Sequence, residues 1–313
     1  MPPLSEVLDA LTYAVLPAAA AAGVVFAAVA KLAPCRFAVA AGALALAAGF
    51  LAGNHFRGAV EFRLDPERRL TPAELGVALR DTFVPPTEED APLPPPARYW
   101  LPWTAALALV GGLVARALRP AAAWPVRVAL AGLAAALAVS PDLRGTAPWL
   151  LPLLAAVILG EWAVLERVGQ GAADGRLRLV PPAAMSLAFF GASVVLLHAH
   201  SARFADTATI LLASLAAVAV AAWLLRADPS AAAPGAAVAL PGLILAGHQD
   251  TSSAVPAASF ALTAVAPLAL GLLLLPAART RPRTAIIGTA ALLVSLLAAG
   301  VVLAARAESL SFE

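Results

Sequence analysis

The sequence predicts an all-α fold, a polytopic bundle of transmembrane helices, and two observations carry that prediction. Hydrophobic residues make up 61% of the 313 residues and charged residues only 13%, whereas soluble domains are about half apolar and about a quarter charged. The apolar residues also occur in long runs separated by short charged breaks, which is typical of helices that cross a bilayer. Both observations exclude a water-soluble globular protein.

Ten apolar stretches are long enough to cross the hydrocarbon core, some of them only barely. They lie at residues 10–30, 37–53, 100–116, 124–140, 147–165, 181–198, 207–225, 233–247, 254–277 and 284–305. The stretch at 233–247 is the weakest, because it contains Pro234, Pro241 and several glycines, and it could be a re-entrant hairpin. We expect about ten spans, with eight or nine as the alternative.

The charges between the spans predict the orientation and the organisation of the chain. Lys and Arg concentrate in alternate connections, including those with Lys31 and Arg36, with Arg116, Arg119 and Arg127, and with Arg279, Arg281 and Arg283. These connections should face the cytoplasm, which places both termini outside. We therefore expect two spans in residues 1–53, an outer loop at 54–99, and an eight-helix transmembrane region at 100–313.

The outer loop contains one short amphipathic segment. Thr71-Pro72-Ala73-Glu74 is a capping box with proline at the first helical position, and Leu75, Leu79 and Phe83 follow at helical spacing. A proline-rich acidic tether then leads into the third span. The apolar side of this helix could dock a partner, lie on the membrane surface, or cover its own bundle as a lid.

Glu161 is the best-placed ionisable residue within a span, and ionisable groups in a bilayer are default functional candidates. We expect it near the inner end of the fifth span. A structural role there would be snorkelling to the headgroups or pairing with an inner arginine. The alternative is a proton or cation site within the bundle.

All four histidines, which are His55, His198, His200 and His248, fall at predicted outer ends of spans. Imidazoles can bind a metal or haem, or they can lie at the interface and cap helix ends. Residues two apart point to opposite sides of a helix. Joint ligation by His198 and His200 therefore requires the sixth span to end before them.

The polar segment from Gly247 to Ser253 follows the short, proline-interrupted eighth span. Short or broken helices expose backbone groups that bind substrates in transporters. His248, Gln249 and Asp250 are therefore the first candidates for a ligand site, and an ordinary polar turn is the alternative.

Several function classes lack support in the sequence. The net charge of +2 gives no basic excess for nucleic acid, and Cys35 is the single cysteine, so no dithiol motif exists. Signatures such as GxSxG, the P-loop and HExxH are absent, which disfavours an enzyme. Abundant alanine, and arginine in place of lysine, indicate a bacterial cytoplasmic membrane protein.

Three functional hypotheses remain. The foremost is a non-catalytic membrane subunit or scaffold of a larger complex, because spans poor in polar residues do not make a hydrophilic path. The second is a small-solute or ion transporter with its site near the eighth and ninth spans. The third is a metal- or haem-binding membrane protein that uses the outer histidines.

Overall fold

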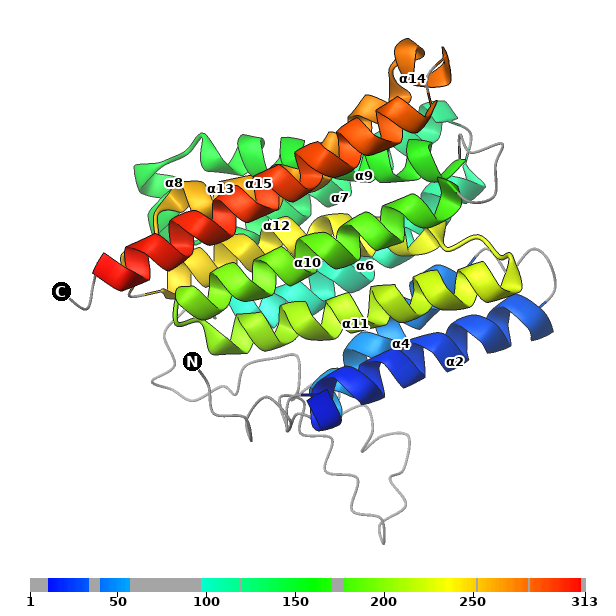
Figure 1. Ribbon diagram of the computed structural model, residues 1–313, viewed down its shortest axis with the longest axis horizontal. Helices are drawn as coiled ribbons and strands as arrows, with labels where there is room; N and C mark the ends of the chain where they lie inside the picture. The colour runs from blue at the N-terminus through cyan, green and yellow to red at the C-terminus, as the bar shows by residue number, and fades with distance from the viewer. Residues whose placement is uncertain are drawn as a thin grey trace, which may run out of the picture.

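The computed structural model describes residues 11–33, 40–56, 97–118, 120–170, 177–251, 253–280 and 282–310, and within these ranges the chain is helical and contains no strand. The long elements run roughly parallel or antiparallel to one another in a bundle (Figure 1). They are α2 (Leu16–Leu32), α4 (Ala41–Phe56), α6 (Ala97–Ala117), α7 (Pro120–Ala138), α9 (Leu150–Gln170), α10 (Val180–His198), α11 (Ala202–Leu225), α12 (Ala233–Asp250) and α15 (Pro282–Leu310).

Shorter elements join or extend these helices. A π-helical turn, η1 (Leu11–Val15), leads into α2, and α13 (Ala257–Val265) continues directly into the 3-10 helix η4 (Ala266–Leu274). The remaining short elements are α8 (Pro141–Thr146), η2 (Leu177–Leu179), η3 (Ser230–Ala232) and α14 (Pro276–Thr280). The predicted outer helix with Leu75, Leu79 and Phe83 lies outside the described residues.

In the part of the chain that the structure describes, six helices are long and apolar enough to cross a membrane. They are Leu11–Leu32, Leu177–His198, Ala202–Leu225, Ser230–Asp250, Ala257–Leu274 and Pro282–Ala307. Three further apolar helices are shorter, at Ala41–Asn54, Thr104–Ala117 and Ala122–Ala138. The all-α membrane class predicted from the sequence is therefore supported, but the count of ten spans and the outer position of the termini are not.

Helix α9, which corresponds to the fifth predicted stretch, shows why the span count differs. Helix α9 is 21 residues long, but it carries Glu161, Glu166 and Arg167. Charges at this density lower the apolar character of a segment that is otherwise long enough to cross. Helix α4 is apolar but short, because its 16 residues reach only about 24 Å along the axis.

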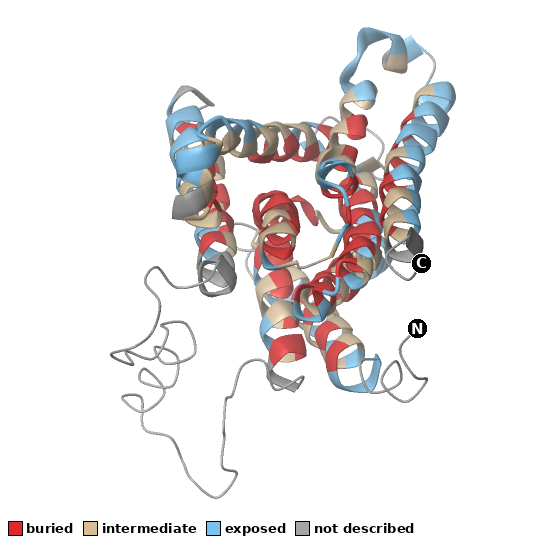
Figure 2. Ribbon diagram, turned by 90° about the vertical axis from the view of Figure 1, so that its left-hand side faces the viewer, coloured by how far each residue is buried: buried red, intermediate tan, exposed pale blue. Residues whose placement is uncertain are grey.

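Helix α12 is the central element of the bundle. In the candidate span Ser230–Asp250, 94% of the apolar window is buried inside the protein, and α12 packs against α6, α9, α10, α11 and α13. Figure 2 shows the buried residues gathered on the helices at the middle of the bundle. The helix continues through Pro241, so the re-entrant hairpin considered for this stretch is wrong. Neighbouring helices that enclose a proline make such an interruption tolerable.

Close helix contacts occur where glycines face neighbouring backbone. A Cβ atom at Gly49 of α4 would lie 2.8 Å from the Ala18 carbonyl oxygen of α2, and one at Gly42 would lie 2.5 Å from the Pro229 carbonyl oxygen. Small residues allow membrane helices to approach in this way. Helix α4 is thus held tightly between α2 and α11, while α15 exposes large apolar side chains such as Ile287 and Val294.

Candidate functional site

Two carboxyl groups lie on the buried side of α9. Its buried residues are Ile158, Glu161, Trp162, Leu165, Glu166, Val168 and Gly169. Intervals of three and four residues place them along one face of a helix, and this helix packs against α7, α12 and η4. Local periodicity therefore brings both acids into the interior of the bundle, although their surroundings differ.

Glu161 is fully buried, with no exposed surface. Neither of its carboxyl oxygens has a hydrogen-bond partner among the described residues. It lies near the middle of α9, rather than near the inner end as the sequence predicted, because the helix continues to Gln170 beyond the apolar stretch. Snorkelling or pairing with an inner arginine was the structural role expected for this residue, and both expectations are wrong for the observed side chain.

Glu166 has the ionic partners that Glu161 lacks. A terminal nitrogen of Arg127 lies 2.6 Å from its Oε2 atom, and Nε of Arg116 lies 3.7 Å from its Oε1 atom. Arg116 also donates a hydrogen bond of 2.6 Å to the Ser230 hydroxyl. The glutamate side chain is only 4% exposed and the two arginines are 13% and 16% exposed. This network joins α6, α7, α9 and η3 at one end of the bundle.

Two indole rings lie beside Arg127 of this network. The guanidinium carbon of Arg127 lies 5.7 Å from the Trp124 ring centre and 6.0 Å from the Trp162 ring centre. Both distances are within the range of cation–π attraction. Trp162 is fully buried, follows Glu161 directly, and its indole nitrogen has no hydrogen-bond partner among the residues described. We call Glu161, Trp162, Glu166, Arg127 and Arg116 the α9 charge cluster.

Sequence reasoning missed most of this cluster. The sequence pattern predicts only that Arg116 and Arg127 orient the chain, and it does not single out Glu166. The detectable signal is the four-residue interval between Trp162 and Glu166, which puts these two side chains on neighbouring positions of one helix face. The partners on α6 and α7 carry no such signal, because their contact with Glu166 depends on tertiary packing.

The polar residues predicted as a ligand site lie at the opposite end of α12 from η3. Gln249 donates a hydrogen bond of 3.2 Å to the Ala138 carbonyl oxygen at the end of α7, and Asp250 is exposed. Thr251 donates to the Ala199 carbonyl oxygen just after α10. Hydroxyl and amide groups therefore satisfy free carbonyls at helix ends in this region. Ligand binding by His248, Gln249 and Asp250 stays a prediction.

The histidines do not form one group in the part of the chain that is described. His198 is the last residue of α10, while His200 is exposed with a φ of 56°. His248 lies against Phe260, with 4.8 Å between ring centres, and its buried Nδ1 atom has no partner among these residues. The side chain of His55 lies outside the described residues. Where the structure can be described, no three His, Cys, Asp or Glu side chains gather to hold a metal, so metal or haem binding stays a prediction.

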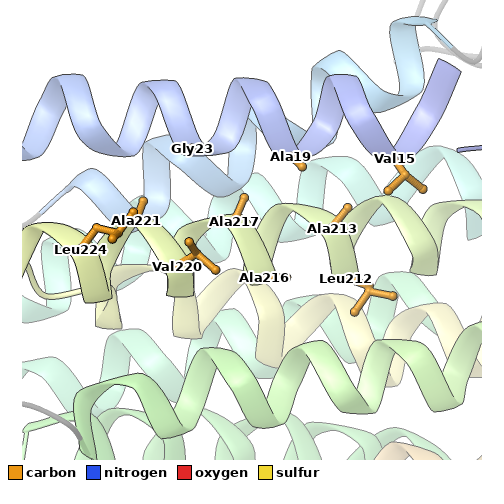
Figure 3. Close-up of a pocket in the computed structure, with 10 residues that line it drawn as sticks. All are labelled: Val15, Ala19, Gly23, Leu212, Ala213, Ala216, Ala217, Val220, Ala221 and Leu224. Carbon is orange, nitrogen blue, oxygen red and sulfur yellow. The ribbon is translucent and has the colours of Figure 1, made fainter. Parts of the chain in front are cut away.

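A groove between α2 and α11 is lined by no ionisable residue. It has a volume of about 610 Å³ and is lined entirely by apolar residues and glycine, among them Val15, Ala19, Gly23, Leu212 and Leu224 (Figure 3). The α9 charge cluster remains the place where buried ionisable groups meet.

The chain matches no protein-family model, no curated protein and no solved structure in the comparisons made. The class of protein is therefore inferred from the helices of the structure alone. The six helices among the described residues that are able to cross a bilayer are compatible with a multi-pass integral membrane protein in contact with lipid.

Proposed function

We propose that the protein is a transporter of a small solute or ion, in which Glu161 binds the transported proton or cation. One observation carries the proposal: this carboxyl group is fully buried and neither oxygen has a described partner. Burial of an unpaired ionisable group is costly, and within membrane helices such groups commonly mark ion or proton pathways. A purely structural carboxylate would be expected to have partners like those of Glu166.

The position of α9 beside the central helix also supports transport. Helix α9 packs against α12, whose interior contains Pro241. Apolar segments that contain proline and glycine are a recurring sequence feature of transporter binding sites, although α12 itself is one continuous helix. The proposed site therefore lies on the side of α12 that faces α9, whereas the sequence predicts a transport site near 233–247 and 254–277.

The proposed topology has ten crossings, with both termini outside a bacterial cytoplasmic membrane. Each of the ten predicted stretches overlaps a helical segment, counting α13 and η4 as one. Arginines from α6 and α7 offset the charge of Glu166 on α9, which supports counting α9 as one of the ten crossings. Cysteine accessibility at positions 118 and 200 tests this topology, because the proposal puts the first inside and the second outside.

Reconstituted proteoliposomes test transport directly. Proton, Na⁺ and K⁺ gradients would be imposed in turn, and their dissipation would be compared with that in empty liposomes. We expect faster dissipation of at least one gradient with the native chain and the empty-liposome rate with Glu161→Gln. Asp206→Asn, the same chemical change on α11, should behave like the native chain. Native dissipation at the empty-liposome rate, or full activity of Glu161→Gln, would refute the proposal.

A scaffold or membrane subunit is the second candidate, and one observation favours it. Several buried hydroxyl groups are occupied within their own helices: Ser186, Ser214 and Thr263 each donate to the carbonyl oxygen four residues earlier. They therefore do not line a continuous hydrophilic path. Exposed apolar residues of α15 would offer a surface to a membrane protein partner. Stable co-purification with such a partner, without flux, would favour this function.

A further inference from the structure

The groove between α2 and α11 has the length of one leaflet of a bilayer. The two helices lie side by side and run in the same direction (Figure 1), and the part of α11 that lines the groove extends from Leu212 to Leu224. These twelve residue steps span about 18 Å along the helix axis. Half of the hydrocarbon core of a bilayer is about 15 Å deep. The groove therefore matches the length of one lipid tail.

The groove is also narrow. Its volume of about 610 Å³ over a length of about 18 Å gives a mean cross-section of about 34 Å². An α-helix with its side chains is at least about 10 Å wide and needs about 80 Å². Val15 lies at one end of the groove and Leu224 at the other (Figure 3). The space between them suits one extended hydrocarbon chain and is too narrow to enclose a helix.

Two positively charged residues lie beyond the Leu224 end of the groove. Gly23 of α2 and Ala217 of α11 are neighbours, because a Cβ atom at Gly23 would lie 4.0 Å from the Ala217 Cβ atom. Lys31 is eight residues after Gly23, and Arg226 is nine residues after Ala217, so both cations lie at one level. Both residues are exposed, and neither forms an ion pair with a described residue.

The residues around this end of the groove indicate the depth of the lipid headgroups. Trp223 is 65% exposed, and tryptophan concentrates at the membrane–water interface. Arg178 is a third exposed cation, and its neighbour Leu179 packs against the cluster that α2 and α11 form here. Asp228 accepts a hydrogen bond of 2.9 Å from the Ser230 backbone N–H group. Three cations therefore outnumber one acid at this level.

We propose that the groove binds one tail of an anionic phospholipid, with the headgroup phosphate beside Lys31 and Arg226. Lipid tails are as apolar as the groove, so the tail gains mainly dispersion contacts there. Selectivity comes from the charges, since each Lys or Arg near an anionic headgroup contributes about fivefold in affinity. In the proposed topology this end of the groove lies in the cytoplasmic leaflet. The lipid site does not depend on Glu161 or on transport.

Lipid titration of the full chain in non-ionic detergent, followed by native mass spectrometry, tests the site. The two probes are phosphatidylglycerol and phosphatidylcholine with identical acyl chains. We expect one phosphatidylglycerol per chain, bound at least about tenfold more tightly than phosphatidylcholine. Gly23→Leu should weaken binding of both lipids about fivefold, through the loss of roughly ten dispersion contacts. The added Cβ atom itself has room, because its nearest neighbour is 4.0 Å away.

The charge variant combines Lys31→Gln with Arg226→Gln, and it should bind both lipids with the affinity of phosphatidylcholine. Two controls carry the same changes elsewhere. Gly132→Leu is on α7, where a Cβ atom meets no neighbour within 4 Å, and Arg203→Gln changes an exposed arginine at the opposite end of α11. Both controls should bind like the native chain. Thermal unfolding establishes that each variant is folded, and the charge variant keeps the test decisive if Gly23→Leu does not fold.

The site is overturned if the native chain binds the two lipids equally, or if Gly23→Leu or the charge variant binds like the native chain. Equal losses from Gly23→Leu and Gly132→Leu would also overturn it. A dimer that retains no lipid and that Gly23→Leu disrupts would assign the groove to a second copy of the chain instead. Lipid binding is measured without ion flux, so failure of the proposed transport leaves this site standing, and failure of the site leaves transport standing.

Discussion

Glu161 and Glu166 should respond in opposite ways to the same substitution. Glu161→Leu removes a fully buried carboxyl group without described partners, so it should raise the free energy of unfolding by about 1–3 kcal/mol. Glu166→Leu leaves Arg116 and Arg127 without their shared partner. Breaking a buried ion pair costs about 3–5 kcal/mol, and the partial exposure of both arginines places the expected loss near about 3 kcal/mol.

Unfolding in mixed micelles, followed by circular dichroism, measures both variants under one set of conditions. Circular dichroism is preferred to tryptophan fluorescence because Trp162 neighbours the first substitution. Losses of similar size from both variants would refute the reasoning, since Glu161 would then have a stabilising partner in the native protein. A gain at Glu161 accompanied by loss of ion flux would be the trade-off expected of a functional residue that destabilises its fold.

The remaining predictions concern packing and hydrogen bonding, and the free energy of unfolding measures each of them. Gly49→Ala should lower the free energy of unfolding by about 1–3 kcal/mol through overpacking against α2 and α11. Gly132→Ala should raise it by up to about 1 kcal/mol, because a Cβ atom there meets no neighbour within 4 Å. Equal effects of the two substitutions would contradict the glycine contacts. Thr289→Val should stabilise by about 1 kcal/mol, because the buried Thr289 hydroxyl lacks a described partner, and a loss would reveal one. Ser230→Ala should destabilise by about 1–2 kcal/mol by removing the acceptor of Arg116, and a neutral result would show that water replaces it.

The hydropathy pattern predicts helices well where lipid or packed apolar surface surrounds them. The stretch 181–198 corresponds to α10 at Val180–His198, and 284–305 lies within α15. These segments are long apolar runs, so their periodicity and length are sufficient. Their ends extend a few residues further because helical hydrogen bonding does not stop where apolar residues do.

The candidate site was less predictable because it depends on tertiary partners. The apolar run of the fifth stretch ends at residue 165, yet α9 continues through Glu166, whose charge is offset by arginines from two other helices. Whether a proline-containing segment such as 233–247 forms a helix or a hairpin likewise depends on what surrounds it. A single sequence shows the residues of the α9 charge cluster without showing that they meet.

The enclosed position of α12 has a consequence for how the bundle is made. Helices α6, α9, α10 and α11, which surround it, all precede it in the chain, and α13 follows directly. These four helices are therefore synthesised before α12, which packs between them. Among the six candidate spans it has the lowest mean hydropathy, so its transfer from the ribosome into the membrane gains most from docking on helices already there. Assembly of this protein thus depends on order of synthesis as well as on the apolar character of each segment.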